Sequence, residues 1–442
     1  MKKVKLGEIL DVKRGTSLPG KHYSETGKYI RLTLGNFNYP NGGFKENTSK
    51  KDIFFTGKVS SEFILKKDDI ITPLTEQVSG LLGETARIPE SDLYIQSGDI
   101  GLIKTKEPLD NSYAYYLISS PMVKKQLGAA AQQTKIRHTS PEKIKDCYVW
   151  IPDKYQQEKS GRLLDQINEI IDNNNLIIKK SESIISDLYD RWFLQFDFPN
   201  ENNKPYKSSN GIMEWDESLS QEIPKNWKIK KLKDLVSDDK YAIVDGPFGT
   251  QLKISEYDKS GNIPIYEMEQ LDNSFITTNF KHFINEKKYQ EIKRSTVRNG
   301  DIVISKTGTL GLLGIVNSDF EKGILVSRLA KITPDEKKLG KYSLFQILLH
   351  LSKSNYWIMK SSGSTMPILN NSLIENISVL YPDNNLYKKY EDKVSKLYDL
   401  IYKCKIQNNK LVDLRDTLLP LFINGQLKIE DWFFFFCSII KN

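Results

Sequence analysis

Cysteine and histidine are scarce in this chain of 442 residues, which contains three cysteines and four histidines. Cys147, Cys404 and Cys437 lie far apart, so they fit neither a zinc knuckle nor a disulfide framework. We therefore expect a reduced, cytoplasmic setting and no metal-rich site. No apolar run approaches the roughly 20 residues of a membrane-spanning helix, and the lysine-rich start lacks the apolar segment of a secretory signal.

The motifs of several enzyme classes are also missing. No Pro-Pro pair occurs, which removes the Asn/Asp-Pro-Pro-Tyr/Phe loop of an adenine methyltransferase, and no GxxxxGK[ST] loop is present to bind the phosphates of ATP. Pro382-Asp383 and Glu391-Asp392-Lys393 superficially match a PD…ExK nuclease site. In the helix expected there, however, Glu391 and Lys393 are two positions apart and point away from each other. The sequence therefore predicts that this chain performs no chemistry itself.

The charge and the length set broad limits on the function. The chain has 64 Lys and Arg against 56 Asp and Glu, a formal net charge of +8. This surplus is compatible with nucleic-acid binding but does not establish it. At roughly 150 residues per domain, the length corresponds to about two or three domains.

Four landmarks occur twice in the same order, which is typical of an internal repeat. Each second occurrence follows the first by 226 to 232 positions. The pairs are Asp69-Ile-Ile71 with Asp301-Ile-Val303, Ser79-Gly-Leu-Leu-Gly83 with Leu310-Gly-Leu-Leu-Gly314, Ile151-Pro-Asp153 with Tyr381-Pro-Asp383, and Asp187-Leu-Tyr-Asp190 with Asp413-Leu-Arg-Asp416. We infer a duplicated module of about 200 residues.

Each copy of the module has a globular part and a helical part. The globular parts, residues 6–149 and 227–380, contain short apolar runs broken by glycine, proline and asparagine, which predicts short strands joined by turns. Examples of such strands are Asp69-Ile-Ile-Thr and Asp301-Ile-Val-Ile-Ser. One helix is expected in each part, over residues 113–126 and 342–359. The fold class is therefore α+β, with two similar mixed α/β domains.

The helical parts follow Pro152 and Pro382. Residues 162–197 and 386–419 contain neither proline nor glycine, and apolar residues recur at alternating spacings of four and three, the period of a coiled coil. The expected rows are Leu163, Ile167, Ile170, Asn174, Ile177, Ser181, Ile184 and Leu188, and Tyr390, Val394, Leu397, Ile401, Cys404, Asn408 and Leu411. Each row contains one asparagine, which either fixes the register of a helix pair or lies at an open part of the seam.

The second copy contains a series of recognisable motifs. They are Ile223-Pro-Lys-Asn-Trp227-Lys, Asp245-Gly-Pro-Phe-Gly-Thr-Gln-Leu-Lys253, Gly300-Asp-Ile-Val-Ile-Ser-Lys-Thr-Gly-Thr-Leu-Gly311, Ser362-Gly-Ser-Thr-Met366, Val379-Leu-Tyr-Pro382 and Leu418-Leu-Pro-Leu-Phe422. With this order the chain resembles a specificity subunit of a type I restriction-modification system over residues 4–427. The first copy departs from the pattern, since Val12-Lys-Arg-Gly-Thr16 replaces the Gly-Pro-Phe-Gly segment and Pro73-Leu-Thr-Glu-Gln77 replaces the Lys-Thr-Gly-Thr loop.

The resemblance implies a non-catalytic chain with two target-recognition domains, each reading one part of a split double-stranded DNA sequence. Two long antiparallel coiled-coil helices would hold these domains apart. The implied partners are two methylation subunits, which modify adenine, and two restriction subunits, which translocate and cut DNA. S-adenosylmethionine, ATP and Mg²⁺ are then expected in those partners, with no cofactor bound by this chain and no contact with a membrane.

The resulting division of the chain has six parts. They are the first target-recognition domain at 1–150, the first long helix at 151–197, an exposed linker at 198–226, the second target-recognition domain at 227–380, the second long helix at 381–427 and an atypical tail at 428–442. The tail contains Trp432 followed by four phenylalanines and is expected to lie outside the repeat.

DNA contacts are expected from polar and basic loop residues. Glutamine, arginine and lysine form bidentate or phosphate contacts, and short hydroxyl side chains approach phosphates closely. The candidates are Gln133, Thr134, Lys135, Arg137, Lys253, Lys306, Thr307, Thr309, Ser364 and Thr365. For each loop the alternative is a turn that only supports the fold, or a solvated loop. Other cations, such as Arg14 and Arg328, have less support because exposed lysine and arginine are common everywhere.

Two other functional classes stay open at this point. One is a self-contained DNA-modifying or DNA-cutting enzyme, against which the missing motifs argue. The other is a coiled-coil structural adaptor, which would leave about 300 residues of globular repeat without a role.

Overall fold

A computed structural model describes residues 1–39, 42–76, 80–130, 137–259, 261–277, 280–361, 367–382 and 385–428. The chain divides into two compact units. Unit 1 comprises Met1–Ile171 and Lys410–Asn442, and unit 2 comprises Asp172–Asn409. Each unit combines small sheets with helices, so the mixed α/β character expected from the sequence is confirmed.

Unit 1 is built on two four-stranded sheets. The strand orders are β2-β10-β6-β8 and β3-β5-β4-β9, and two-stranded ladders join β1 to β12 and β7 to β11. The strands are β1 (Lys2–Lys5), β2 (Leu10–Arg14), β3 (Tyr23–Ser24), β4 (Tyr29–Arg31), β5 (Phe54–Phe55), β6 (Ile70–Pro73), β7 (Thr75–Glu76), β8 (Ala86–Arg87), β9 (Tyr94–Ile95), β10 (Ile100–Thr105), β11 (Arg137–His138) and β12 (Tyr148–Ile151). The short helices are α1 (Leu6–Ile9), α2 (Asn111–Ile118), α3 (Pro121–Ala130) and α4 (Pro141–Lys145).

The core of unit 1 forms between its central sheet and α2 and α3. Ile70 of β6 and Tyr113 of α2 are buried in one apolar cluster. The run Asp69-Ile-Ile-Thr forms β6, as the sequence predicts. The single helix expected over 113–126 is instead divided into α2 and α3, because Pro121 cannot continue the helix that precedes it.

Unit 2 has a five-stranded sheet of order β16-β24-β21-β22-β18 and a four-stranded sheet of order β19-β17-β23-β20. Two-stranded ladders pair β13 with β14 and β15 with β25. The strands are β13 (Met213–Asp216), β14 (Gln221–Pro224), β15 (Lys228–Lys231), β16 (Ile243–Asp245), β17 (Ile263–Tyr266), β18 (Ser274–Ile276), β19 (Phe283–Ile284), β20 (Thr296–Val297), β21 (Ile302–Ser305), β22 (Leu313–Val316), β23 (Gly323–Leu325), β24 (Leu329–Ile332) and β25 (Ser378–Tyr381). The short helices are α6 (Glu286–Ile292), α7 (Lys341–Lys353), α8 (Tyr356–Lys360) and α9 (Asn371–Glu375).

The central strand of the five-stranded sheet is buried along its whole length. The run Asp301-Ile-Val-Ile-Ser forms β21, as predicted, and every residue of that strand is buried. The helix expected over 342–359 is divided into α7 and α8. The division falls at Asn355, whose φ of 57° is left-handed and cannot belong to an α-helix.

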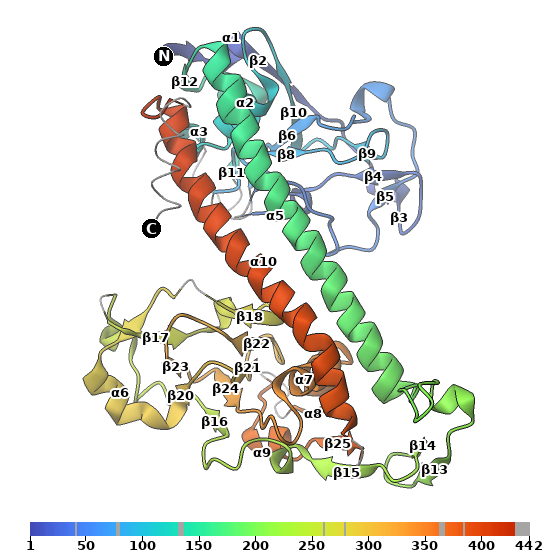
Figure 1. Ribbon diagram of the computed structural model, residues 1–442. Helices are drawn as coiled ribbons and strands as arrows, with labels where there is room; N and C mark the ends of the chain where they lie inside the picture. The colour runs from blue at the N-terminus through green and yellow to red at the C-terminus, as the bar shows by residue number, and fades with distance from the viewer. Residues whose placement is uncertain are drawn as a thin grey trace. The chain divides into compact units, whose positions relative to one another are not determined.

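Two long helices follow the globular parts. They are α5 (Lys154–Tyr189), which continues as a π-helical turn over Asp190–Leu194, and α10 (Leu386–Ile423). Within unit 2 they lie side by side and run antiparallel (Figure 1), because Asn174 Nδ2 donates to Gln407 Oε1 over 2.9 Å while the Tyr390 hydroxyl donates to the Ile185 carbonyl over 3.2 Å. The two asparagines expected in the seam meet directly, since Asn174 Nδ2 also lies 2.9 Å from Asn408 Oδ1.

The buried face of α5 corrects the row expected from the sequence. Ile167, Asn174 and Ser181 are buried as predicted, but Ile170, Ile177 and Ile184 are exposed. Their neighbours Ile171, Ile178 and Ile185 take the inward positions. Adjacent residues on a helix are about 100° apart, so an Ile-Ile pair satisfies either row, and only packing decides between them. The row predicted for α10 is buried or half-buried throughout.

The segment at 198–226 is less exposed than a simple linker. It contains the hairpin β13–β14, and Phe198 is buried and stacks on Trp227 with ring centroids 5.4 Å apart. Aromatic burial therefore ties this connection to the core of unit 2. The tail at 428–442 lies outside the described residues apart from Lys428. Among the helices that the structure describes, none is long and apolar enough to cross a membrane.

Candidate nucleic-acid interface

Three turns of unit 2 lie close together at the same end of the strands of its five-stranded sheet. They are residues 246–254, which follow β16, residues 306–312, which join β21 to β22, and residues 326–328, which join β23 to β24. The neighbouring antiparallel strands β16, β24 and β21 place the three turns together, since Asp245 pairs with Ala330 and Ser305 pairs with Leu329 (Figure 1). We call this group the turn cluster of unit 2.

Backbone hydrogen bonds hold the turn cluster together. The Gly246 amide donates to the Leu329 carbonyl over 3.0 Å, and the Lys306 amide donates to the Arg328 carbonyl over 2.8 Å. The Lys306 carbonyl in turn accepts from the Leu369 amide over 3.0 Å. The segment that carries the predicted residues Ser364 and Thr365 is therefore joined to the same cluster at Leu369, although these two residues themselves lie outside the described residues.

The glycine of the Gly-Pro-Phe-Gly segment is required by a close approach of two backbones. A Cβ atom at Gly246 would lie 2.0 Å from the Val326 carbonyl oxygen, which no side chain can tolerate. Gly246 thus lets the first turn rest directly on the third.

Lys306 ties two of the turns by an ion pair. Its Nζ lies 2.6 Å from Asp245 Oδ2, and the residue is only 7% exposed. The structure thus places this predicted DNA-contact residue inward, where its charge is matched by a carboxylate. Lys306 positions the turns in this arrangement.

Three further predicted residues of unit 2 that the structure describes lie nearer to solvent. Thr309 and Lys253 are exposed, and Thr307 is half-buried. The Ser305 hydroxyl donates to the Thr309 carbonyl over 2.5 Å and accepts from the Leu312 amide over 2.8 Å, which closes the turn. The glycine-rich stretch after Lys306 is therefore a strand-to-strand turn.

Two exposed side chains of the turn cluster are not among the main DNA-contact residues predicted from the sequence. Phe248 is 68% exposed, and Arg328 is exposed and forms no ion pair with a described residue. An aromatic residue is normally assigned to the core, so hydrophobicity alone misplaces Phe248. The usable signal was its position between Gly246-Pro and Gly249, which indicates a turn.

The same turn cluster recurs in unit 1. Four backbone hydrogen bonds of 2.8 to 3.1 Å have counterparts 229 to 232 positions apart. The amide-to-carbonyl pairs are Gly15 to Ile100, Leu74 to Asp99, Ile100 to Ser97 and Thr139 to Leu74 in unit 1, and Gly246 to Leu329, Lys306 to Arg328, Leu329 to Val326 and Leu369 to Lys306 in unit 2. A Cβ atom at Gly15 would also lie 2.2 Å from the Ser97 carbonyl oxygen, as at Gly246.

The side chains around the cluster of unit 1 are different. Leu74 occupies the place of Lys306, and the buried Glu76 accepts from the amides of Gly80 and Leu82 over 3.1 and 3.0 Å. Arg137 lies 3.4 Å from the same carboxylate and is half-buried. The predicted residues Gln133, Thr134 and Lys135 precede it and lie outside the described residues.

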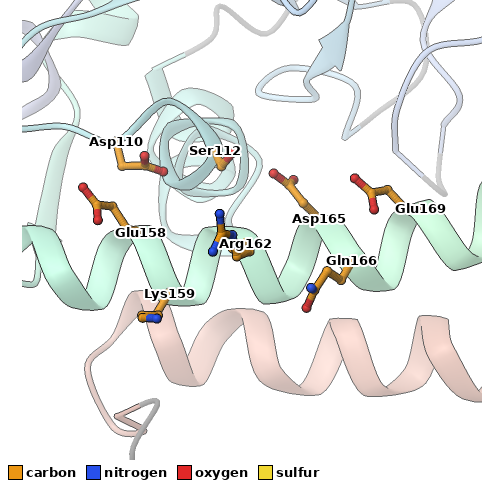
Figure 2. Close-up of a pocket in the computed structure, with 8 residues that line it drawn as sticks. All are labelled: Asp110, Ser112, Glu158, Lys159, Arg162, Asp165, Gln166 and Glu169. Atoms are coloured by element: carbon orange, nitrogen blue, oxygen red, sulfur yellow. The ribbon is translucent and has the colours of Figure 1, made fainter.

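A hollow of about 720 Å³ lies beside α5 in unit 1 (Figure 2). It is lined by Asp110, Ser112, Glu158, Lys159, Arg162, Asp165, Gln166 and Glu169. Four carboxylates against two cations repel phosphate, so this hollow does not suit a DNA backbone. Asp110 and Asp165 are also engaged already, because Asp110 caps α2 through the Tyr113 amide and Asp165 pairs with Arg87 over 2.8 Å.

Glu391, the glutamate of the apparent nuclease motif, is a helix cap. Its two carboxylate oxygens accept from the amides of Tyr342 and Ser343, each over 2.9 Å, at the first turn of α7. Burial raises the pKa of Glu391, although the bonds from Ser343 and Tyr342 pull it down. No group of three or more possible metal ligands occurs among the described residues.

Comparison with known families agrees with this architecture. The model of the family described as type I restriction modification DNA specificity domain matches residues 1–182 and 224–411, which is more than half of the chain. The chain belongs to this family, and the resemblance to type I specificity subunits is confirmed.

Named relatives support the assignment, and a solved structure shares the fold. The MjaIX specificity subunit of Methanocaldococcus jannaschii is 24% identical over 326 residues, which cover 74% of this chain and 71% of the relative. The HindI specificity subunit of Haemophilus influenzae is 23% identical over 327 residues, which cover 63% of this chain and 68% of the relative. The crystal structure of a type I system S subunit from M. genitalium shares the fold, with a TM-score of 0.57 at 19% identity over 96% of both chains.

Proposed function

We propose that this chain is the DNA-reading subunit of a type I restriction-modification complex and that each globular part reads one half of a bipartite double-stranded DNA target. The observation that carries this proposal is the repeated turn cluster. Its backbone bonds are the same in both units, while the side chains at its tips differ. Backbone hydrogen bonds are largely independent of the side-chain type, so the same framework can present two different sets of side chains to DNA.

The repeated turn cluster also favours an internal duplication, and a repeated pair of strands agrees with it. In each unit the strand that enters the globular part pairs with the strand that precedes the long helix, β1 with β12 and β15 with β25. The finer architecture that we propose is two similar target-recognition domains joined by an antiparallel coiled coil of α5 and α10.

The partners follow from the family. We infer that the two long helices set the length of the unread spacer and dock two methylation subunits, and that two restriction subunits join the complex. Adenine methylation and ATP-dependent cleavage would then reside in those partners, together with S-adenosylmethionine, ATP and Mg²⁺. The predicted contacts from Gln133, Lys135 and the other loop residues remain part of this proposal, with the exception of Lys306, which is paired with Asp245.

Exchange of one globular part tests the proposal. Residues 227–380 are replaced by the corresponding segment of a relative, and the methylated motif of the host is determined by methylome sequencing. We expect one half of the motif to change and the other to persist. The reciprocal exchange of residues 6–149 is the control and should change the other half. A change in both halves after either exchange contradicts the assignment of one half-site to each part.

A further inference from the structure

The loop of residues 246–254 exposes two large apolar side chains. Phe248 is 68% exposed and Ile254 is 82% exposed, although both lie within a short segment that is otherwise anchored to unit 2. Exposed apolar side chains that are held in place commonly mark a contact surface.

Phe248 is exposed because the loop is fixed on both sides of it. Gly246 rests against the Val326 carbonyl, and Leu252 is buried in the apolar cluster of Ile263 and Ile324. Between these anchors the amides of Gln251 and Leu252 donate to the Phe248 carbonyl over 2.8 and 3.2 Å. The Phe248 amide in turn donates to Gln251 Oε1 over 3.2 Å. The ring is therefore presented by an ordered turn.

The turn cluster that carries Phe248 also carries two exposed cations. Lys253 and Arg328 are exposed, and neither forms an ion pair with a described residue. The acidic residue at the base of the cluster, Asp245, is paired with Lys306 over 2.6 Å. An exposed apolar ring in a turn cluster that also carries exposed cations matches the chemistry of DNA, in which stacked bases lie between two rows of phosphates.

We propose that Phe248 determines specificity in unit 2 by contacting a base through its ring, while Lys253 and Arg328 contact the flanking phosphates. This inference rests on the proposed function, since it names the chemistry of one of the two readers. Apolar side chains read the thymine methyl group or enter between base pairs, whereas phosphate contacts carry no sequence information.

The test uses the assembled complex with its methylation subunits, whose preferred motif is first determined by methylome sequencing. Binding to a duplex with that motif and to a scrambled duplex is then measured over a series of salt concentrations. The variants are Phe248→Ala, the conservative Phe248→Leu and Lys253→Ala. Trp215→Ala is the matched control, because Trp215 is 60% exposed in the same unit but lies on β13, outside the turn cluster.

We expect Phe248→Ala to weaken binding to the motif by roughly 5- to 150-fold, with little effect on the scrambled duplex and no change in salt dependence. Phe248→Leu should recover part of the discrimination. Lys253→Ala should weaken both duplexes and lower the salt slope by about one ionic contact. Trp215→Ala should behave like the wild type.

Three results would overturn the inference. The first is a Phe248→Ala complex that discriminates between the duplexes as well as the wild type does. The second is a Phe248→Ala chain that no longer assembles with the methylation subunits in gel filtration, which would assign the ring to a protein contact. The third is a wild-type complex without any preferred motif, which is visible before a variant is made and would overturn the proposed function as well.

Discussion

At the scale of single residues, charged side chains in unit 2 hold backbone segments in place. Lys306 joins two turns through Asp245, and Glu391 caps the first turn of α7. Gly340, just before α7, has a φ of 79° and packs against the Glu391 carboxylate, so the cap depends on a glycine as well. A carboxylate at a helix N-terminus satisfies orphan amides and interacts favourably with the helix dipole.

The raised pKa of Glu391 predicts a pH-dependent stability. Its folded-state value lies above the unfolded value of about 4.3, so the folded chain binds the additional proton in the interval between them. The stability of the wild type relative to Glu391→Gln should therefore fall as pH rises through that interval and stay constant above it. Urea unfolding over a pH series measures this difference.

Asp392→Asn serves as the control for this prediction, because Asp392 is exposed on the same turn of α10. Asp392→Asn should change the stability by no more than about 0.5 kcal/mol, as is usual for an exposed side chain. Glu391→Ala should lose about 0.5–2 kcal/mol of stability, the usual cost of a lost helix cap. A difference between wild type and Glu391→Gln that does not vary with pH would contradict the proposed role of burial.

At the scale of elements, the pair of long helices contains one polar layer. Asn174 is buried and donates to Gln407 and Asn408, and Asn408 Nδ2 donates to Asn175 Oδ1, all over 2.9 Å. A buried amide of this kind costs stability compared with an apolar residue but restricts the register in which two helices pair.

Substitution of the polar layer should change the stability of the chain and the register of the two helices in different ways. Asn174→Leu alone removes the donor to the side-chain oxygens of Gln407 and Asn408 and should cost about 1–3 kcal/mol in urea unfolding. Asn174→Leu with Asn408→Leu should recover part of this loss, since leucine then faces leucine at this point of the seam. A complex that contains the double variant should also methylate motifs with more than one spacer length, because the register of the two helices is no longer fixed. A single unchanged spacer in the double variant would show that the layer does not set the register.

At the scale of the whole molecule, the helices are long enough to act as a ruler for the target. α5 and α10 have 36 and 38 residues, or roughly 55 Å each at 1.5 Å per residue. An insertion of one residue rotates the rest of a helix by about 100° and breaks its buried row, whereas a heptad preserves the row. A heptad adds roughly 10.5 Å, close to three base pairs.

Matched heptad insertions should therefore lengthen the spacer by about three base pairs. Suitable positions follow Ile177 and Cys404, which lie three residues from the bonded pair Asn174 and Gln407 in opposite chain directions. We expect both half-sites to persist while the spacer grows, as read from the methylated motif. An insertion in α5 alone is the control and should abolish activity. An unchanged spacer in an active double-insertion complex would show that the helices do not set it.

The sequence predicts the strands and long helices well, because their signals are local. Asp69-Ile-Ile and Asp301-Ile-Val have the apolar runs of buried strands, and the rows of α5 and α10 have the period of paired helices. The correct row on α5 was missed where two isoleucines adjoin, since such pairs satisfy both choices. The breaks at Pro121 and Asn355 were missed because the surrounding apolar pattern continues through them.

The candidate interface is less predictable because its key contacts join distant segments. Lys306 and Asp245 are 61 positions apart, so nothing local shows that the lysine faces inward rather than toward DNA. The exposure of Phe248 likewise depends on Val326 and Leu252, which anchor the loop on either side of the ring. Tertiary packing decides both cases.

The repeated close contact at Gly15 and Gly246 has a consequence for how such proteins diversify. Any residue other than glycine at either position would push a backbone away from the carbonyl on which it rests, so these two sites are closed to mutation. Exposed positions beyond them, such as Lys253 and Thr309, are not held by such a contact and tolerate other side chains. Under the proposed function, a change of the exposed tip residues alone would alter the target sequence and leave the scaffold intact.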